Sequence, residues 1–364
     1  MKGIMSRVIR RREDNTMIVD KEYCMSSFLL YRRVVDRNKG FAEGLLPKTV
    51  PETWNKKKIY DSFQLENHLR ERVKEATCDG KTALALSGGI DSAILAKMMP
   101  KGSTAYTFRC IADDHNTVDE TPRAKFYADT CGLKHNVIDI TWDDMTSITP
   151  TLIKHKNAPL HSIEIQIFKA GVQAKKDGFD RIIYGETADV NYGGLSNVLS
   201  KEWSVGEFIE RYAYLKPWYV LKQPKVDFSC VLPYCRSDGT VDVHKYLSRF
   251  DIIESINSYI NACETAEIEF VAPFADTCLG SQLDLDVIRC GRNKYLIRDI
   301  FERLYKDVVI PDKIPMPRAT DQWLMKWNGP KRYEFIPNCV NGLTGDQKWL
   351  VWCLEECLNV LNIE

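Results

Sequence analysis

Short apolar runs alternate with helical patterns along the chain between about residue 60 and residue 184. Four apolar runs are typical of buried strands in a parallel sheet, where both faces of the sheet are covered: residues 82–86, 104–108, 136–140 and 181–184. Apolar residues recur at helical spacing before and between these runs: residues 61–79, 92–98, 119–131, 143–154 and 162–176. The alternation predicts an α/β fold with a parallel sheet flanked by helices.

The two ends of the chain show other patterns. Residues 16–19 and 26–35 are interpreted as short strands, within a small N-terminal segment over residues 1–60. Beyond residue 195 the pattern is mainly helical, and we expect these helices to form a layer that closes over the ligand crevice of the sheet: residues 203–215, 244–260, 282–290, 294–305 and 347–361. The predicted division is therefore 1–60 and 61–364.

The junction of the first apolar run with the next helix holds the clearest chemistry. The run ends at Leu86 and is followed by Ser87-Gly88-Gly89-Ile90-Asp91-Ser92. The glycines allow a tight turn that exposes backbone N–H groups, and the start of the helix adds partial positive charge, so a polyphosphate fits there. The serine hydroxyls can donate to phosphate oxygens, and Asp91 offers a hard oxygen ligand to the Mg²⁺ that accompanies ATP. No Gly-Lys-Ser/Thr follows, so this is not a Walker loop.

Composition narrows the class of protein. Hydrophobic residues make up 44% and charged residues 27% of the 364 positions, as in an ordinary globular chain. The formal net charge is zero, and the one basic cluster, at positions 7 and 10–12, lies beside an acidic pair, so we expect no nucleic-acid partner. No apolar stretch is long enough to cross a bilayer and no signal peptide is evident, which predicts a cytoplasmic protein with no membrane role. The 12 cysteines include no Cys-x-x-Cys pair and are expected to be reduced.

The loop Ser87–Ser92 resembles the pyrophosphate loop of the ATP pyrophosphatases, or PP-loop superfamily, whose members cut ATP between the α- and β-phosphates. Three further segments are similar to the asparagine synthetase family within it. Residues 185–194 (GETADVNYGG) resemble its Gly-Glu-Gly-Ser/Ala-Asp-Glu segment, and residues 273–276 (PFAD) and 294–298 (KYLIR) resemble Pro-Phe-Leu-Asp and Lys-x-Leu-Leu-Arg. Residues 310–317 (IPDKIPMP) resemble the lysine-bearing loop near the end of the synthetase domain.

The resemblance implies an adenine nucleotide α-hydrolase-like PP-loop fold and a site for ATP and Mg²⁺. Asp91 and Asp189 would hold the metal, Lys313 would stabilise charge on the α-phosphate, and Glu186 would bind or deprotonate the incoming amine. The expected nucleotide-binding residues are Leu86, Ser87, Gly88, Gly89, Asp91, Ser92, Thr107 and Gly185. For Asp189, Glu186 and Lys313, the plain alternatives are a helix cap, a structural acceptor and a surface cation. Asp119 and Glu120 are interpreted as a helix start, and Arg298 as a support of the fold.

In this family the substrate carboxylate attacks the α-phosphorus of ATP, and an amine then attacks the acyl-adenylate to form an amide and AMP. The chain departs from the glutamine-using members because Met1 is followed by Lys2 and the first cysteine is Cys24. We therefore expect no glutaminase activity of its own, and residues 1–60 are interpreted as a shortened remnant of such a domain. The nitrogen would come from free ammonia, from a partner glutaminase, or from a primary amine on the acceptor, as in the related β-lactam synthetases and lasso-peptide cyclases.

The carboxylate substrate is a small molecule or a peptide. Val190 and Leu195 replace an acidic residue and a tyrosine usual in asparagine synthetase. Both are expected beside the substrate crevice, which argues against aspartate as the substrate. Two other functions stay open: adenylation for another nucleophile, in sulfur transfer or nucleic-acid modification, and nucleotide binding without turnover. A homo-oligomer is compatible with the sequence.

Overall fold

A five-stranded sheet lies at the centre of the computed structural model, which describes residues 17–50, 55–112, 117–313 and 316–364. All neighbouring strands are parallel, in the order β6-β5-β4-β7-β8. The strands are β4 (Thr82–Ala85), β5 (Thr104–Cys110), β6 (Lys134–Ile140), β7 (Arg181–Ile183) and β8 (Glu269–Val271). The predicted α/β class and its four strands are confirmed, whereas the short strand β8 was not expected.

The order of the strands creates a crevice at the centre of the sheet. From β4 the chain continues to β5 and β6 on one side, and then crosses to β7 and β8 on the other side. The loops after β4 and β7 therefore leave the sheet in different directions and open a crevice between them. Parallel sheets bind ligands in such a crevice. Leu84 pairs with Ile183, so the two strands end at the same level. The loop 87–92 and the segment that begins at residue 184 consequently face one another.

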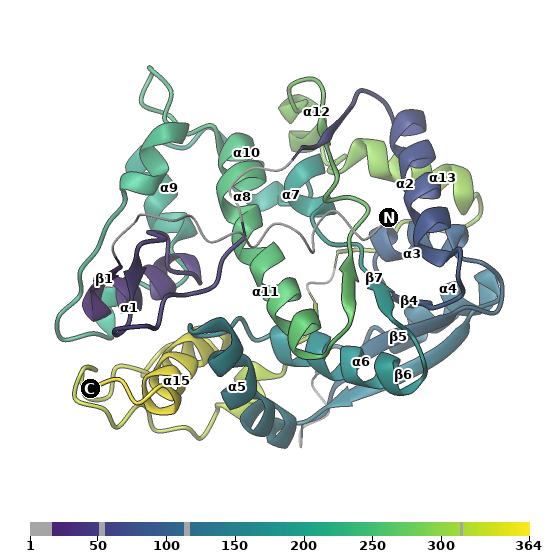
Figure 1. Ribbon diagram of the computed structural model, residues 1–364. Helices are drawn as coiled ribbons and strands as arrows, with labels where there is room; N and C mark the ends of the chain where they lie inside the picture. Colours follow the sequence, from purple (N-terminus) through teal and green to yellow (C-terminus); the bar gives the residue numbers. More distant parts are fainter. Residues whose placement is uncertain (1–16, 51–54, 113–116, 314–315) are drawn as a thin grey trace.

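Helices cover both faces of the sheet (Figure 1). One face carries α2 (Ser62–Thr77), α3 (Ile90–Met98), α4 (Thr121–Cys131) and α13 (Tyr295–Leu304). The other carries α5 (Trp142–Lys156), α6 (Glu164–Lys176) and α11 (Ile252–Thr265), with α15 (Gly345–Val360) and α1 (Lys21–Tyr31) packed beyond α5. Successive side chains of a strand pack against the two helical layers alternately. Ala83 belongs to the core with α5, α6 and α11, and Leu84 belongs to the core with α2, α3 and α13.

Smaller elements surround these layers. The strands β1 (Ile18–Val19) and β2 (Lys39–Gly40) pair with each other, as do β3 (Lys57–Ile59) and β9 (Thr277–Leu279). The short helices are α7 (Ala188–Tyr192), α8 (Ser196–Leu199), α9 (Val205–Tyr212), α10 (Val243–Tyr246), α12 (Leu285–Arg289) and α14 (Thr320–Trp323). Among the described residues, none of the helices has the length and apolar character that a bilayer span requires. All 12 cysteines are free thiols, as expected.

Two expectations are wrong. The run 26–35 is not a strand, because residues 21–31 form α1, whose N-terminus is capped by Asp20 accepting from Tyr23 N at 3.2 Å. The late helices do not form one layer over the crevice, since α13 packs on α2 and α3 while α11 packs on α5 and α6. The basic cluster at positions 7 and 10–12 lies outside the described residues. The division at residue 60 and its interpretation as a glutaminase remnant stay predictions.

Candidate functional site

The loop after β4 is held closed by its own serines. Ser87 N donates to Ser92 Oγ at 3.0 Å, the two hydroxyl oxygens lie 2.9 Å apart, and Gly89 N donates to Ser87 Oγ at 3.2 Å. A Cβ at Gly88 would lie 3.3 Å from Glu120 Oε1, so a side chain there would press on α4. The loop thus has a preformed shape before any ligand binds.

The segment after β7 approaches this loop closely. A Cβ at Gly185 would lie 3.2 Å from both Asp91 Cβ and Ser92 N, so glycine allows the two loops to touch. Thr187 then adopts a left-handed φ of 71°, a strained conformation for a β-branched residue and one that clusters at functional sites. The turn starts α7, which carries Asp189 toward the loop.

Four charged side chains meet between the two loops. Lys294 Nζ lies 2.5 Å from Asp91 Oδ2 and 2.7 Å from Asp189 Oδ1. Lys313 Nζ reaches the same oxygen of Asp189 at 2.8 Å. The Lys294 side chain is 7% exposed, whereas that of Lys313 is 40% exposed. Lys294 is therefore a buried counter-ion of both carboxylates, whereas Lys313 is the more exposed cation of the group.

The two carboxyl groups are held in different states. Burial raises the pKa of Asp91, and Lys294 offsets this only in part. The Asp189 side chain is 33% exposed, and two lysines outweigh the effect of its partial burial and lower its pKa to about 2. Asp91 Oδ1 is buried without a hydrogen-bond partner in the described structure. One free carboxylate oxygen beside a second carboxylate suits a hard divalent cation such as Mg²⁺, so the residues fit the expected metal.

The pair is incomplete as a metal site by itself. Among the described residues, no group of three or more His, Cys, Asp and Glu side chains could hold a metal ion. Magnesium bound to ATP takes further ligands from phosphates and water, which accords with a site of one or two carboxylates. The metal role of Asp91 and Asp189 stays a prediction.

Glu186 is positioned by residues of α11. Ser255 Oγ of α11 donates to Glu186 Oε1 at 2.6 Å, and Tyr259 also forms a hydrogen bond to the carboxyl. Burial raises the pKa of Glu186, and these hydrogen bonds counter it in part. The result is a positioned carboxyl with raised proton affinity, as a general base requires.

A cavity of about 210 Å³ joins these groups. Its lining includes the expected residues Leu86, Ser87, Gly89, Asp91, Ser92, Thr107, Gly185, Glu186, Asp189 and Lys313. Gly88 is not on the lining and supports the turn instead. Thr107 Oγ1 donates to the carbonyl of Leu86 at 2.6 Å and fixes the end of β4. The structure brings the residues together, while their individual roles stay predictions.

Several lining residues were not assigned a site role from the sequence. Lys294 was noticed only as part of the KYLIR motif, and Glu120 only as a helix start. Glu120 lines the cavity, and burial raises its pKa to about 7, against a hydrogen bond from Gly88. Arg298 also lines the cavity, although its guanidinium donates to the carbonyl of Asn293 at 2.7 Å.

The two replaced positions lie elsewhere than expected. Val190 is 7% exposed and belongs to the hydrophobic core, and Leu195 packs against the same core. Neither is among the lining residues of the cavity in the described part of the chain. Their identity therefore says nothing about whether aspartate is the substrate.

The model of a protein family described as asparagine synthase matches residues 64–249, just over half of the chain. No curated protein matches the chain. Solved structures similar to it include an NMN synthetase from Francisella tularensis, with 13% identity, a TM-score of 0.29, and 70% of this chain and 100% of that chain covered. An NH₃-dependent NAD synthetase from Campylobacter jejuni has 13% identity and a TM-score of 0.26, covering 71% and 100% of the two chains. A U34-tRNA thiolase from Methanococcus maripaludis has 14% identity and a TM-score of 0.24, covering 72% and 91%. Scores this low carry no functional conclusion.

Proposed function

The chain belongs to the asparagine synthase family, and from this premise we propose that it adenylates a carboxylate with ATP and transfers the acyl group to ammonia or an amine. Membership supports an ATP-utilising enzyme. The finer proposal depends on one observation: Asp91, Asp189, Lys313 and Glu186 line a single cavity where the strand order reverses.

The first step would occur beside the loop 87–92. A substrate carboxylate oxygen attacks the α-phosphorus, the bond to the bridging oxygen breaks, and pyrophosphate leaves toward the serines. Asp91 and Asp189 would bind Mg²⁺, which supplies positive charge to the triphosphate. Lys313 is half-exposed and can leave Asp189 for the α-phosphate, where its charge would stabilise the transition state.

The second step would use Glu186. The acyl carbon of the adenylate is attacked by the amine, AMP leaves, and Glu186 accepts a proton from the nitrogen. The buried carboxyl has a raised pKa, so it binds this proton more strongly than an exposed glutamate would. The nitrogen source is ammonia, free or from a separate glutaminase, or an amine of the acceptor.

The proposal is tested by the nucleotide products. The protein is incubated with ATP, Mg²⁺, pooled carboxylates and ammonia, and AMP and pyrophosphate are measured. AMP with pyrophosphate supports the proposal. ADP with phosphate contradicts it, and no turnover with any pool favours nucleotide binding without catalysis.

The role of Lys313 is tested by Lys313→Ala. We expect ATP affinity to stay within about threefold, because the loop and the carboxylates remain, and adenylation to fall about 100-fold, as for loss of one transition-state donor. Lys306→Ala, at an exposed position outside the cavity lining, is the matched control and should change neither quantity. Equal losses of affinity and rate in Lys313→Ala would remove the transition-state role.

A further inference from the structure

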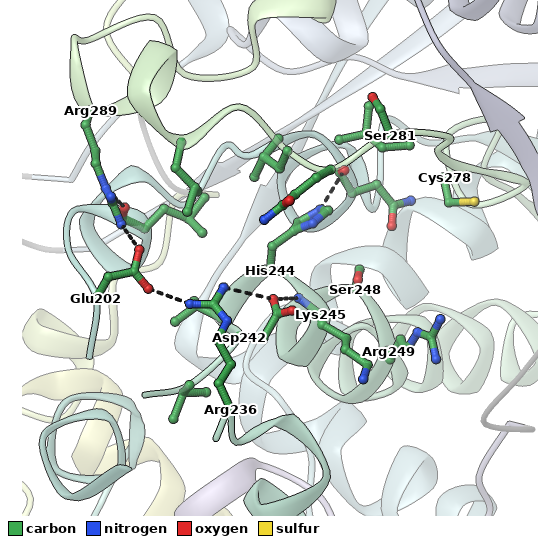
Figure 2. Close-up of a pocket in the computed structure, with 18 of the residues that line it drawn as sticks. Glu202, Arg236, Asp242, His244, Lys245, Ser248, Arg249, Cys278, Ser281 and Arg289 are labelled. Atoms are coloured by element: carbon green, nitrogen blue, oxygen red, sulfur yellow. Dashed lines mark hydrogen bonds and ion pairs between the residues drawn. The ribbon is translucent and has the colours of Figure 1, made fainter. Parts of the chain in front are cut away.

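A second and larger cavity, of about 550 Å³, is shown in Figure 2. Helix α7 contributes Asn191 to its lining and Asp189 to the lining of the nucleotide cavity. The second cavity is within the size range of sites for small organic molecules. Segments far apart in the sequence line it, and six of its side chains are basic against two acidic ones, Glu202 and Asp242. The basic residues are Lys56, Lys201, Arg236, Lys245, Arg249 and Arg289.

Both acidic residues are engaged at one end of the cavity. Glu202 pairs with Arg236 at 2.6 Å and with Arg289 at 2.7 Å, as Figure 2 shows. Asp242 lies 3.9 Å from Arg236 and caps α10 by accepting from Lys245 N at 3.1 Å. In the described part of the chain, no carboxylate forms an ion pair with the side chains of Lys245 or Arg249. The lining therefore carries an excess of positive charge at its other end.

The backbone that presents this charge is irregular. Between α10 and α11 the helix widens into a π-helical turn over Leu247–Asp251, a feature that is frequent at functional sites. Ser248 and Arg249 of this turn line the cavity, beside Lys245 one turn earlier. The turn thus places a hydroxyl and a guanidinium next to a lysine on one wall.

Lys56 adds a further cation from a distant segment. Its Nζ lies 3.5 Å from both Asn191 Oδ1 and the carbonyl of Ser248. Burial, and to a smaller extent the charge of Arg249, lower the pKa of Lys56 to about 8. An anion bound between Lys56 and Arg249 would relieve this mutual repulsion.

We propose that this cavity binds a small organic anion, whose phosphate or carboxylate groups contact Lys56, Lys245 and Arg249. Several cations that converge on a concave site recognise such oxyanions through charge-assisted hydrogen bonds. Ser248 and Ser281, which also line the cavity, can hydrogen-bond the uncharged part of the molecule. This site goes beyond the proposed function and does not require it.

The two cavities share α7 as a wall. His244 Nε2 donates to the carbonyl of Asn191 at 3.1 Å, and Lys56 contacts the side chain of the same residue. Asp189, on the same short helix, lines the nucleotide cavity. A molecule in the second cavity consequently lies about one helix diameter, roughly 10 Å, from the nucleotide cavity.

Direct binding tests the inference. Glucose 6-phosphate and citrate are titrated calorimetrically into the full chain, and glucose serves as the uncharged probe. No nucleotide is added, because its phosphates would compete for the same cations, and binding in the nucleotide cavity is recognised instead by its loss in Lys313→Ala. We expect saturable binding of at least one anionic probe and none of glucose, and the preferred probe distinguishes phosphate from carboxylate recognition.

Variants locate the bound anion. The double variant Lys245→Met/Arg249→Met should weaken binding at least about tenfold, through loss of two charged contacts. The control Lys154→Met/Arg211→Met removes two exposed helical cations outside this cavity and should leave affinity unchanged. Circular dichroism and thermal unfolding check that both proteins fold.

Three results would overturn the inference. These are no saturable binding of either anionic probe at millimolar concentration, equal affinities for the two double variants, or loss of binding in Lys313→Ala instead. The titration needs no ATP turnover, so a failure of the proposed ligase activity would leave this readout intact.

Discussion

Replacement of Lys294 by methionine tests whether this lysine neutralises the carboxylates of the site. Its side chain is 7% exposed, and its Nζ contacts Asp91 at 2.5 Å and Asp189 at 2.7 Å. Methionine keeps most of the volume but removes the charge. Lys313 still pairs with Asp189, so Asp91 becomes the carboxylate without a cation.

The size of the effect follows from burial. Removal of one partner from a buried ion pair costs about 3–5 kcal/mol, because the other charge stays buried and unpaired. Asp189 keeps one lysine and its side chain is 33% exposed, so the lower end applies. We expect Lys294→Met to lower the free energy of unfolding by about 3 kcal/mol near neutral pH.

The loss should depend on pH in a defined direction. The pKa of Asp91 is already above its usual value, and without Lys294 it rises further. A carboxyl whose pKa is higher in the folded than in the unfolded state destabilises the fold increasingly as pH rises from the unfolded-state pKa to the folded-state pKa. Protonation of the carboxyl removes this penalty as pH falls back through the same range. The deficit of Lys294→Met should therefore be larger at about pH 8 than at about pH 5.

Urea unfolding of wild type and variant at both pH values measures this. Lys125→Met is the control, since Lys125 pairs with Asp129 at 2.8 Å while both side chains are more than 60% exposed, and such pairs contribute about 0.3–0.5 kcal/mol. A deficit below about 1 kcal/mol for Lys294→Met, or one equal at both pH values, would show that Asp91 does not need this counter-ion.

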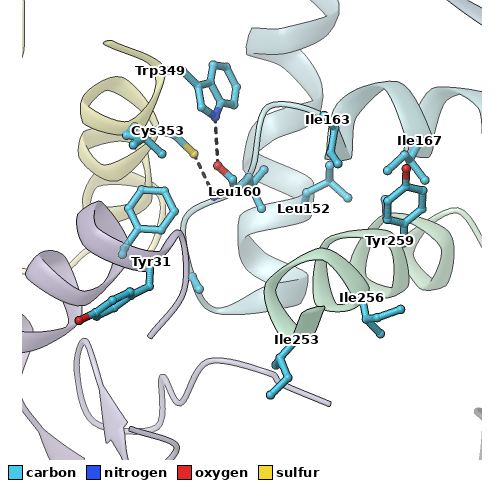
Figure 3. Close-up of a cluster of buried hydrophobic side chains, with 14 of the residues drawn as sticks. Tyr31, Leu152, Leu160, Ile163, Ile167, Ile253, Ile256, Tyr259, Trp349 and Cys353 are labelled. Atoms are coloured by element: carbon cyan, nitrogen blue, oxygen red, sulfur yellow. Dashed lines mark hydrogen bonds between the residues drawn. The ribbon is translucent and has the colours of Figure 1, made fainter. Parts of the chain in front are cut away.

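Three further perturbations have defined outcomes. Gly194→Ala should lower the free energy of unfolding in urea by about 1–3 kcal/mol and impair nucleotide binding, since its Cβ would lie 1.9 Å from Asp189 Oδ1. Gly206→Ala, in α9 with open space around its Cβ, should be neutral or slightly stabilising. Equal effects of the two substitutions would refute the steric reasoning. Glu186→Gln should keep pyrophosphate exchange but lose amide formation, and an unchanged amide yield in this variant would exclude the role of Glu186 as a base. In the wild type, the rate of amide formation should fall as the solution is acidified through a pKa above 4.5. Leu152→Ala, in the buried cluster of Figure 3, should cost about 2–5 kcal/mol in unfolding, and a loss below about 1 kcal/mol would mean that the core repacks.

The central strand, its loop and the following helix could be predicted because local chemistry dictates them. Residues 83–86 are apolar and two glycines follow at positions 88 and 89, which leaves few alternatives to a strand and a tight turn. Helix α1 could not be recognised in the same way. Residues 23–31 are all buried, so its sequence shows no polar face and no helical period. Burial on every side depends on tertiary packing, which local patterns do not contain.

In the candidate site too, some residues could be predicted from local sequence patterns and others depend on tertiary packing. Asp91 and Asp189 follow adjacent strands and could be expected to meet. The role of Lys294 could not be expected, because its partner Asp91 is 203 positions away and the contact depends on how α13 packs against α3. The raised pKa of Glu120 has the same origin, since only the folded structure shows that this helix start is buried.

The charge balance of the group Asp91, Asp189, Lys294 and Lys313 favours one order of loading. Its two ammonium and two carboxylate groups sum to zero, so a bare divalent cation would add uncompensated positive charge beside a fixed lysine. A nucleotide that already carries its cation arrives with net negative charge and meets two lysines. If the proposed function holds, the pocket should therefore bind free Mg²⁺ weakly, and it should bind Mg²⁺ better when the nucleotide is present.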